Sequence, residues 1–459
     1  MSIDDAHPAT GEDRKKHTID FDRHSTAYRT DFEEITQDLH SRCPVAWTGQ
    51  HGGYWLASGN QEVFDLARRA DLLSNDNDVK GERKGYFGIT IPHRPRDEVS
   101  TRGGFLEMDP PEQRHYRQAL NPYLSPAAVA RWQPVMNEIT RACIDERIET
   151  GTIDFVDDLA NIVPAVMTMA LLGLPLRDWE VFCEPAHATV YTKPDSPEMA
   201  KVIDGMIQSY VLITEHIGRI RAEPRPGLID ALVNADINGS RPTDQDITES
   251  VMLLIGGGFD TTTALTAHSL EWLAENPAER ERLSRERDVL LDSATEEFLR
   301  YFTPAVGDGR TIAADCEVAG TRFKEGERLW LSWAMANRDA RVFDAPDTVL
   351  LDRKGNRHAS FGLGIHRCIG SNFARKSFKT MLTHVLDRMP DYTCVAEGTV
   401  HYDTTGLING MKHLPAIFTP GRRLGAGIDE TLDALQKVCD EQGLAAPVTA
   451  NRATARPDR

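Results

Sequence analysis

Apolar residues recur at helical spacing over much of the chain, almost without a break from residue 127 to residue 274. Clusters of glycine and proline divide this stretch into separate helices. Strand patterns are short. Residues 45–47 and 54–57 flank a Gly52-Gly53 turn and predict a β-hairpin, and residues 311–313 and 413–418 predict further strands. The pattern therefore predicts a mainly α-helical fold with a small β region.

One predicted helix is much longer than the others. Thr243-Asp244-Gln245-Asp246 is similar to a capping box and Pro277 ends the pattern, so we expect about 33 helical residues, roughly 50 Å. The run Gly256-Gly257-Gly258 at its centre costs on the order of 1 kcal/mol per residue relative to alanine. We therefore expect a functional reason for it: room for a flat ligand and a local bulge with free backbone groups. Asp260 and Thr261 then form an acid–alcohol pair suited to proton delivery.

A glycine-rich loop carries a single cysteine. It spans residues 361–370 and reads Phe-Gly-Leu-Gly-Ile-His-Arg-Cys-Ile-Gly. Its glycines permit positive φ and the close approach of a flat, bulky group. Cys368 precedes a helix-permissive run, and a helix N-terminus stabilises the thiolate, the form that binds a metal. A zinc site would need further cysteine or histidine at short spacing beyond His366, and none is nearby.

This loop resembles the haem-binding loop of the cytochrome P450 family and matches it at every fixed position. The run Gly257-Gly258-Phe259-Asp260-Thr261 is similar to a second signature of that family and precedes the loop in the same order. The resemblance implies a cytochrome P450 fold with the long helix over haem b, and Cys368 as thiolate ligand of the iron. The other residues that it places at the cofactor in these two motifs are Gly257, Gly258, Phe361 and Gly370.

Outside these motifs the resemblance assigns a brace, a propionate site and a substrate pocket. Glu297 and Arg300 would be the buried pair that braces the thiolate loop, with residues 336–339 as a third partner, and residues 185–206 resemble a lid over the substrate channel. Gln113 stands near the cofactor where the family often has a histidine. The propionate ligands would be Arg117, Arg310 and His366. The residues expected to face the substrate are Phe87, Ile89, Val306, Leu407 and Ile408.

Composition narrows the class of protein. No apolar run in the 459 residues approaches the length of ~18 residues that a membrane span needs. We therefore expect a soluble cytoplasmic protein. Seven widely spaced cysteines argue against a disulfide framework, and a net charge of -18 disfavours nucleic acid as a partner. We expect a mobile tail over 1–20, a haem domain over 21–420, and an extension over 421–459 with one amphipathic helix before a disordered end.

The expected reaction is insertion of one atom of O2 into a C–H or C=C bond of a terpenoid, steroid or fatty acid. No dinucleotide glycine fingerprint precedes a helix, so electrons are expected from a separate ferredoxin or flavodoxin with its reductase. The expected docking patch consists of Arg114, Arg117, Arg367, Arg375, Lys376 and Lys379. The alternatives are a peroxide-driven peroxygenase, which does not need the Asp260-Thr261 pair, and a haem-binding sensor without turnover. A cysteine hydrolase using Cys368 and His366 is a more remote third.

Overall fold

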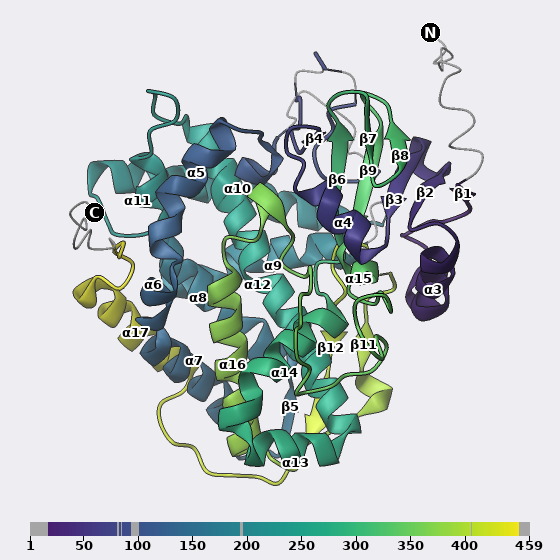
Figure 1. Ribbon diagram of the computed structural model, residues 1–459. Helices are drawn as coiled ribbons and strands as arrows, with labels where there is room; N and C mark the ends of the chain where they lie inside the picture. The colour runs from purple at the N-terminus through teal and green to yellow at the C-terminus, as the bar shows by residue number, and fades with distance from the viewer. Residues whose placement is uncertain are drawn as a thin grey trace, which may run out of the picture.

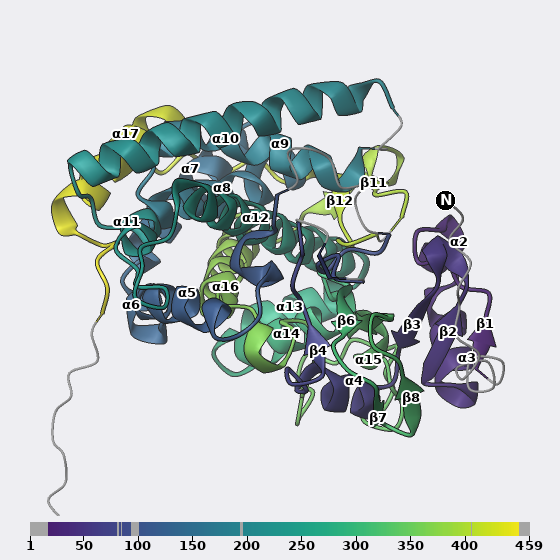
Figure 2. The ribbon, with the colours of Figure 1, turned by 90° about the horizontal axis from the view of Figure 1, so that it is seen from above.

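The computed structural model describes residues 17–79, 82–83, 85–92, 101–192, 196–404 and 406–448. Figure 1 shows a large helical body with a small β region at one side, which confirms the predicted fold class. Helix α12, Asp244–Glu275, passes through the middle of this body. In the view of Figure 2, α10, Glu198–Ala222, lies along the upper edge of the molecule.

Shorter helices surround α12 and lead into the β region. They are α2 (Thr26–Thr30), α3 (Phe32–Arg42), α4 (Asn60–Ala67), α5 (Glu112–Leu120), α6 (Pro126–Ala130), α7 (Gln133–Arg147), α8 (Ile162–Leu172), α9 (Trp179–Tyr191), α11 (Leu228–Val233), α13 (Pro277–Arg285), α14 (Arg287–Phe302), α15 (Trp333–Ala336), α16 (Ser371–Arg388) and α17 (Ile428–Gln442). The strands not described below are β1 (Thr18–Ile19), β4 (Leu73–Ser74), β5 (Thr152–Asp154), β7 (Cys316–Val318), β8 (Thr321–Phe323) and β10 (Thr393–Cys394).

Helix α12 begins where the sequence predicts. The Thr243 hydroxyl accepts a hydrogen bond from the Asp246 N–H at 3.1 Å, and the Asp246 carboxylate accepts one from the Thr243 N–H at 3.0 Å. This reciprocal capping box satisfies two backbone donors at the helix start. The helix then continues without interruption through its glycine run to Glu275, so the bulge expected there is not present in this fully described helix.

Helix α12 packs against α8, α9, α10 and α16. Every residue of α8 is buried, as a helix that is apolar on all sides requires. Helix α16 follows Cys368 directly and also contacts α14 and α7. The helix that carries the predicted proton-delivery pair and the helix that follows the predicted thiolate are therefore parts of one packed core.

The β region is built on a six-stranded sheet with the order β1-β2-β3-β9-β6-β4. Strands β2 (Val45–Thr48) and β3 (Tyr54–Ala57) form the predicted hairpin, with Trp47 opposite Trp55. Strand β9 (Arg328–Ser332) pairs in parallel with β3 and antiparallel with β6 (Gly307–Ile312). Near the C-terminus, β11 (Val400–His401) pairs with β12 (Met411–His413), and β13 (Pro415–Ile417) lies between β10 and β5.

Helix α5 begins later than the local sequence indicates. The sequence Asp109-Pro110-Pro111-Glu112 predicts a helix start with Asp109 as the N-cap, but Asp109 instead accepts hydrogen bonds from the Ser74 hydroxyl at 2.5 Å and the Asn75 N–H at 3.0 Å. The helix starts at Glu112, after Pro111. A contact with a distant part of the chain replaces the local cap, which the sequence pattern could not reveal.

The C-terminal extension forms helix α17, which packs on α7. Its apolar side is buried through Leu432 and Leu435, while Arg177 joins its polar side to Asp429 at 3.0 Å and Asp433 at 2.7 Å. The segments 1–16 and 449–459, which include most of the expected tail and the expected disordered end, lie outside the described residues.

Candidate active site

The loop of residues 361–370 is held by its own backbone and by α4. The Cys368 N–H donates to the Phe361 carbonyl at 2.7 Å, which folds the loop back on itself. Gly364 has a φ of +69°, and a Cβ at this position would lie 2.4 Å from the carbonyl oxygen of Ala67. Both conditions require glycine. The loop therefore lies tightly against the end of α4 before the chain enters α16.

The sulfur of Cys368 faces an internal space. Its side chain is accessible to solvent-sized molecules, yet burial raises the pKa of the thiol. A group that is both accessible and desolvated borders an interior cavity and not the outer surface. The Gly370 N–H and the guanidinium groups of Arg117, Arg367 and Arg375 act in the opposite direction on this pKa, because they stabilise the thiolate.

The two residues expected to brace the loop form a buried ion pair. Arg300 donates two hydrogen bonds to Glu297, both at 2.8 Å, and neither side chain is exposed. Glu297 also accepts from the Leu350 N–H at 2.8 Å and from Arg353 at 2.9 Å. Burial alone would raise the pKa of Glu297, but these donors lower it, so the carboxylate stays charged. A buried ion pair is tolerated when its polar atoms are partnered in this way.

Hydrogen bonds connect this pair to the thiolate loop through Asn337. Arg300 donates to the Asn337 carbonyl at 3.0 Å. The Asn337 side chain accepts from the Ala359 N–H at 2.7 Å and donates to the Ser360 hydroxyl at 2.8 Å. Ser360 in turn donates to a carbonyl of α14 at 2.7 Å. Loss of either charge would therefore loosen the residues that precede the loop.

A second ion pair lies beside the loop, and no motif in the sequence pointed to it. Arg375 of α16 donates to both Glu296 oxygens at 2.5 and 2.6 Å, and its guanidinium lies 4.3 Å from the centre of the Phe361 ring. His358 Nε2 is 3.0 Å from the same carboxylate. Arg375 thus holds the loop against α14, which contradicts its expected place in an open docking patch.

Arg310, Arg117 and His366 lie close enough to affect one another electrostatically. Burial, together with Arg310 and Arg117, lowers the pKa of His366 to about 2, so its imidazole is neutral. Arg310 is 3% exposed, and its carboxylate partner Asp308 is 3.5 Å away. Burial raises the pKa of Asp308, so its carboxylate offsets the positive charge of Arg310 less completely. The cluster therefore has a surplus of positive charge.

Helix α5 contributes two side chains that bind the backbone of the loop. The Gln113 amide donates to the Ile365 carbonyl at 2.9 Å, and Arg117 donates to the Arg367 carbonyl at 2.8 Å. Gln113 is buried and carries no charge. Its hydrogen bond positions the loop, so a histidine is not needed at this position to connect α5 with it.

The glycines of α12 have different surroundings. A Cβ on Gly256 or Gly257 would meet nothing within 4 Å, so this part of the helix borders open space. A Cβ on Gly258 would lie 2.6 Å from the Thr168 hydroxyl oxygen of α8. Gly258 therefore permits close packing of two helices, a different role from the cofactor contact expected for it.

Asp260 belongs to a group of contacting polar side chains that the sequence did not reveal. Its Oδ1 lies 2.6 Å from His187 Nδ1 in α9, and the Tyr402 hydroxyl lies 3.4 Å from the same nitrogen. Asp260 is buried, and Thr261 is partly exposed with its hydroxyl 3.4 Å from the Gly257 carbonyl. His187 lies 73 residues before Asp260 in the sequence, so no local pattern connects the two. The sequence therefore assigned His187 only to the lid segment.

Two residues expected at the substrate meet at the C-terminal hairpin. Ile408 is buried in a cluster that joins Ala264 of α12, Tyr191 of α9 and Tyr402. Leu407 is 37% exposed, and its carbonyl accepts a hydrogen bond from the Val306 N–H at 3.2 Å. The hairpin tip, α9 and α12 thus enclose one apolar region, although nothing is described for residue 405 at this tip.

The remaining expected pocket residues lie near strand β6. Val306 is 4% exposed and packs in a core cluster with Trp330 and Ala334, so its side chain belongs to the protein core and not to an open wall. Ile89 is partly exposed, and its carbonyl accepts from the Gly309 N–H at 2.8 Å. Phe87 is also partly exposed, with the Arg328 guanidinium 5.9 Å from its ring.

Known proteins share these features. The sequence model of the cytochrome P450 family matches residues 188–390, a range that includes α12 and the Cys368 loop. A steroid C26-monooxygenase of Mycolicibacterium smegmatis is 28% identical over 404 residues, covering 85% of this chain and 91% of the relative. The linalool 8-monooxygenase of Pseudomonas putida is 27% identical over 405 residues, covering 84% and 97%. The chain belongs to the cytochrome P450 family.

As a cytochrome P450 it is a monooxygenase, an oxidoreductase. A mutant of P450 EryK in complex with erythromycin B matches with a TM-score of 0.76 at 26% identity, covering 88% of this chain and 100% of that one. CYP109E1 from Bacillus megaterium in complex with testosterone matches with a TM-score of 0.74 at 26% identity, covering 86% and 100%. Among the described residues, no helix combines the length and apolar character that crossing a membrane would require.

Cytochrome P450 proteins hold haem through a thiolate, and three features of this chain fit that group. The Cys368 sulfur borders an internal space with the Gly370 N–H directed toward it. Gly257 of α12 faces space that a Cβ would occupy without contact. The positive surplus around Arg310 and Arg117 fits the two carboxylates of a porphyrin.

The Glu296–Arg375 pair makes loop stability depend on pH. Burial would raise the pKa of Glu296, but hydrogen bonds from Arg375 and His358 lower it to about 2. Because the folded pKa is below the ordinary value of 4.5, the pair stabilises the fold above pH 4.5 and loses its contribution as pH falls toward 2. We predict that Glu296→Gln lowers the free energy of unfolding by about 1–3 kcal/mol at pH 7.

Urea unfolding measured from pH 7 down to pH 3 checks this prediction. The difference between wild type and Glu296→Gln should narrow below about pH 4.5. Asp292→Asn is the matched control, because Asp292 binds Lys379 at 2.7 Å but is 88% exposed. It should change stability by less than about 0.5 kcal/mol. Equal effects of both substitutions would contradict a special role for the half-buried Glu296–Arg375 pair.

Proposed function

We propose that this cytochrome P450 binds haem b through Cys368 and inserts one oxygen atom from O2 into a lipophilic small molecule. Two observations carry the proposal: Cys368 is accessible yet desolvated, and open space lies beside Gly256 and Gly257 of α12, the helix that also carries the acid–alcohol pair Asp260 and Thr261. When bound through a thiolate, haem supplies O2 activation.

In this proposal each residue of the cluster has a role in holding the cofactor. Arg117 and Arg310 bind the propionates by charge-assisted hydrogen bonds, and neutral His366 contributes a hydrogen bond without charge. Gln113 acts on the loop and not on the propionates, as its hydrogen bond to Ile365 supports. Phe361 stacks with Arg375 beside the sulfur and limits water access to it.

Proton delivery runs through α12. The Thr261 hydroxyl can hold a water molecule in the space that Gly257 leaves open, and Asp260 supplies protons from its contact with His187. His187 is partly exposed, so it connects the buried carboxylate with the side of the molecule that faces solvent. This connection favours a reaction that consumes protons, and a peroxide-driven peroxygenase would not need it.

The substrate we propose is a terpenoid, a steroid or a fatty acid. The apolar region between α9, α12 and the hairpin supports this choice, since Ala264, Tyr191 and Ile408 offer surface to hydrocarbon. Relatives that bear the names steroid C26-monooxygenase and linalool 8-monooxygenase support the same range. The haem absorption spectrum is recorded while one member of each of the three classes is added to the enzyme. The compound that changes this spectrum is the substrate for the following experiment.

We predict that Thr261→Ala uncouples the reaction. Without the hydroxyl, the water that delivers protons loses its anchor, so the variant should consume reductant and O2 but release hydrogen peroxide in place of product. The fraction of electrons found in product should fall at least about tenfold. Thr266→Ala is the matched control, because Thr266 lies on the same helix with its hydroxyl bonded to the Thr262 carbonyl at 2.8 Å. Full coupling in Thr261→Ala would show that Thr261 has only a structural role.

For the electrons we propose a ferredoxin that docks beside α16. Lys376 is partly exposed and has no ion-pair partner within the part of the chain that the structure describes. It lines a groove of about 540 Å³ between α7 and α16. Lys379 and Arg388 in the same groove are already paired with Asp292 and Asp145. Lys376 is therefore the charge in this groove best placed to attract an acidic partner to a protein with a net charge of -18.

We predict that Lys376→Glu slows reduction by an acidic ferredoxin about 3–10-fold at low salt, because long-range attraction determines the encounter rate. Exposed charges are screened beyond about 8 Å at physiological ionic strength, so the difference should disappear as salt rises. Stopped-flow reduction across a salt series measures this effect. Lys201→Glu on α10, on another side of the molecule, is the control of equal charge. Equal rates in both variants at low salt would place the docking site elsewhere.

A further inference from the structure

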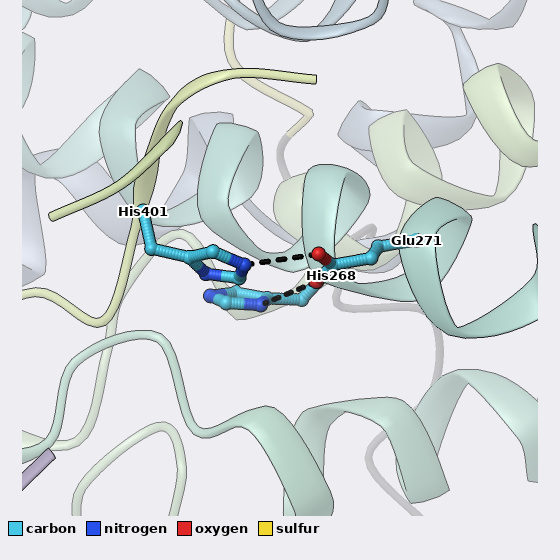
Figure 3. A group of neighbouring side chains, drawn as sticks. All are labelled: His268, Glu271 and His401. Atoms are coloured by element: carbon cyan, nitrogen blue, oxygen red, sulfur yellow. Dashed lines mark hydrogen bonds and ion pairs between the residues drawn. The ribbon is translucent and has the colours of Figure 1, made fainter. Parts of the chain in front are cut away.

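A second group of ligating side chains lies on α12, two turns beyond Asp260. His268 and Glu271 are three residues apart on the same face of the helix, and His401 of β11 points toward them from the hairpin (Figure 3). One nitrogen or oxygen atom from each residue lies within 4.8 Å of the other two. His401 Nε2 is 2.9 Å from Glu271 Oε1, and His268 Nδ1 is 3.9 Å from Glu271 Oε2.

The histidine on α12 lacks the hydrogen bonds that a buried imidazole requires. His268 is 5% exposed, and its Nε2 has no partner in the described part of the chain. The 3.9 Å between its Nδ1 and Glu271 exceeds the length of a hydrogen bond. His401 Nδ1 is likewise buried without a partner among the described residues. The nitrogen of His268 that faces Glu271 is Nδ1, and without a hydrogen bond to the carboxylate it can bind a ligand placed between the three side chains.

Charged groups near the cluster set its local electric field. Glu275 interacts electrostatically with Glu271 and His401, Arg29 with His268 and Glu271, and Asp403 with Arg29. The carboxylates outnumber the single guanidinium, and the local field favours a cation.

We propose that His268, Glu271 and His401 bind a zinc ion, with water as the fourth ligand. Two imidazoles and one carboxylate suit zinc, whereas calcium and magnesium prefer oxygen alone. Ligand atoms about 2.0–2.2 Å from a tetrahedral zinc lie about 3.3 Å apart, so the present separations need side-chain shifts of about 1 Å. The His268 ring is already oriented by stacking on Phe302, 5.3 Å away and tilted by 14°.

Such an ion would connect α12 to the C-terminal hairpin. His401 precedes Tyr402, whose hydroxyl contacts His187, and the same hairpin carries Leu407 and Ile408. A zinc ion at His401 would thus restrain the segment that closes one side of the apolar region. The site is separate from the haem loop, so its occupancy can be measured independently of oxygenation.

The test uses chelator-treated holoenzyme without a histidine tag, mixed with one equivalent of zinc chloride and dialysed. Zinc and iron are counted by mass spectrometry, and about one zinc per haem iron is expected. Zinc absorption spectra should give nitrogen and oxygen at about 2.0–2.2 Å and no sulfur at about 2.3 Å. Zinc should also slow hydrogen exchange of residues 400–413.

Single variants locate the ion. His401→Ala, at a side chain 33% exposed, and Glu271→Gln should each weaken zinc binding more than about 100-fold while the haem spectrum stays unchanged. His413→Ala is the control, because His413 forms an exposed cluster with Asp154 and Asp157. The proposal is overturned if wild type retains no zinc, if zinc binding survives both site variants, if sulfur is a ligand, or if iron(II) binds in place of zinc under competition.

Discussion

The thiolate that we propose at Cys368 would lie in a desolvated interior and would need stabilisation without direct contact from solvent, and this requirement accounts for most contacts around Cys368. Its partners are a backbone N–H at the start of α16 and guanidinium groups at longer range. Neither kind of partner works unless the loop is rigid. The loop is therefore fixed from three directions: by α4 at Gly364, by α5 through Gln113, and by α14 through the Glu297–Arg300 pair.

Helix α12 is a second rigid element, in addition to the loop that carries Cys368. That helix is buried at most positions but open at Gly256 and Gly257, so space is available where a flat cofactor has to lie. The elements that pack around the apolar region beside α12 are α9 and the C-terminal hairpin. In the proposed function, the oxygen chemistry therefore depends on the Cys368 loop and α12, and the choice of substrate depends on α9 and the hairpin.

The sequence was most informative where function imposes fixed spacing within one segment. The Cys368 loop and the capping box of α12 could both be recognised from residues adjacent in the chain, and the role of the Asp260-Thr261 pair stays a prediction. Roles set by distant contacts could not be predicted. Gly258 serves packing against Thr168, and Arg375 binds Glu296, because of neighbours that the tertiary fold supplies.

Asp109 and His187 illustrate the same limit for polar groups. Asp109 has the local features of an N-cap, but the hydroxyl of Ser74, 35 residues away, competes successfully for its carboxylate. His187 looks like an ordinary residue of a lid segment until folding brings it to Asp260. In both cases the deciding interaction joins segments whose proximity no local pattern encodes.

The central claim is that Cys368 ligates haem iron as a thiolate, and the absorption spectrum of the reduced carbonyl complex tests it most directly. Wild-type protein should show the red-shifted Soret band that a thiolate ligand produces, and Cys368→Ala should lack it. Cys316→Ala, at a partly exposed cysteine in β7, should retain the band and controls for loss of a thiol. A red-shifted band that persists in Cys368→Ala would contradict the account.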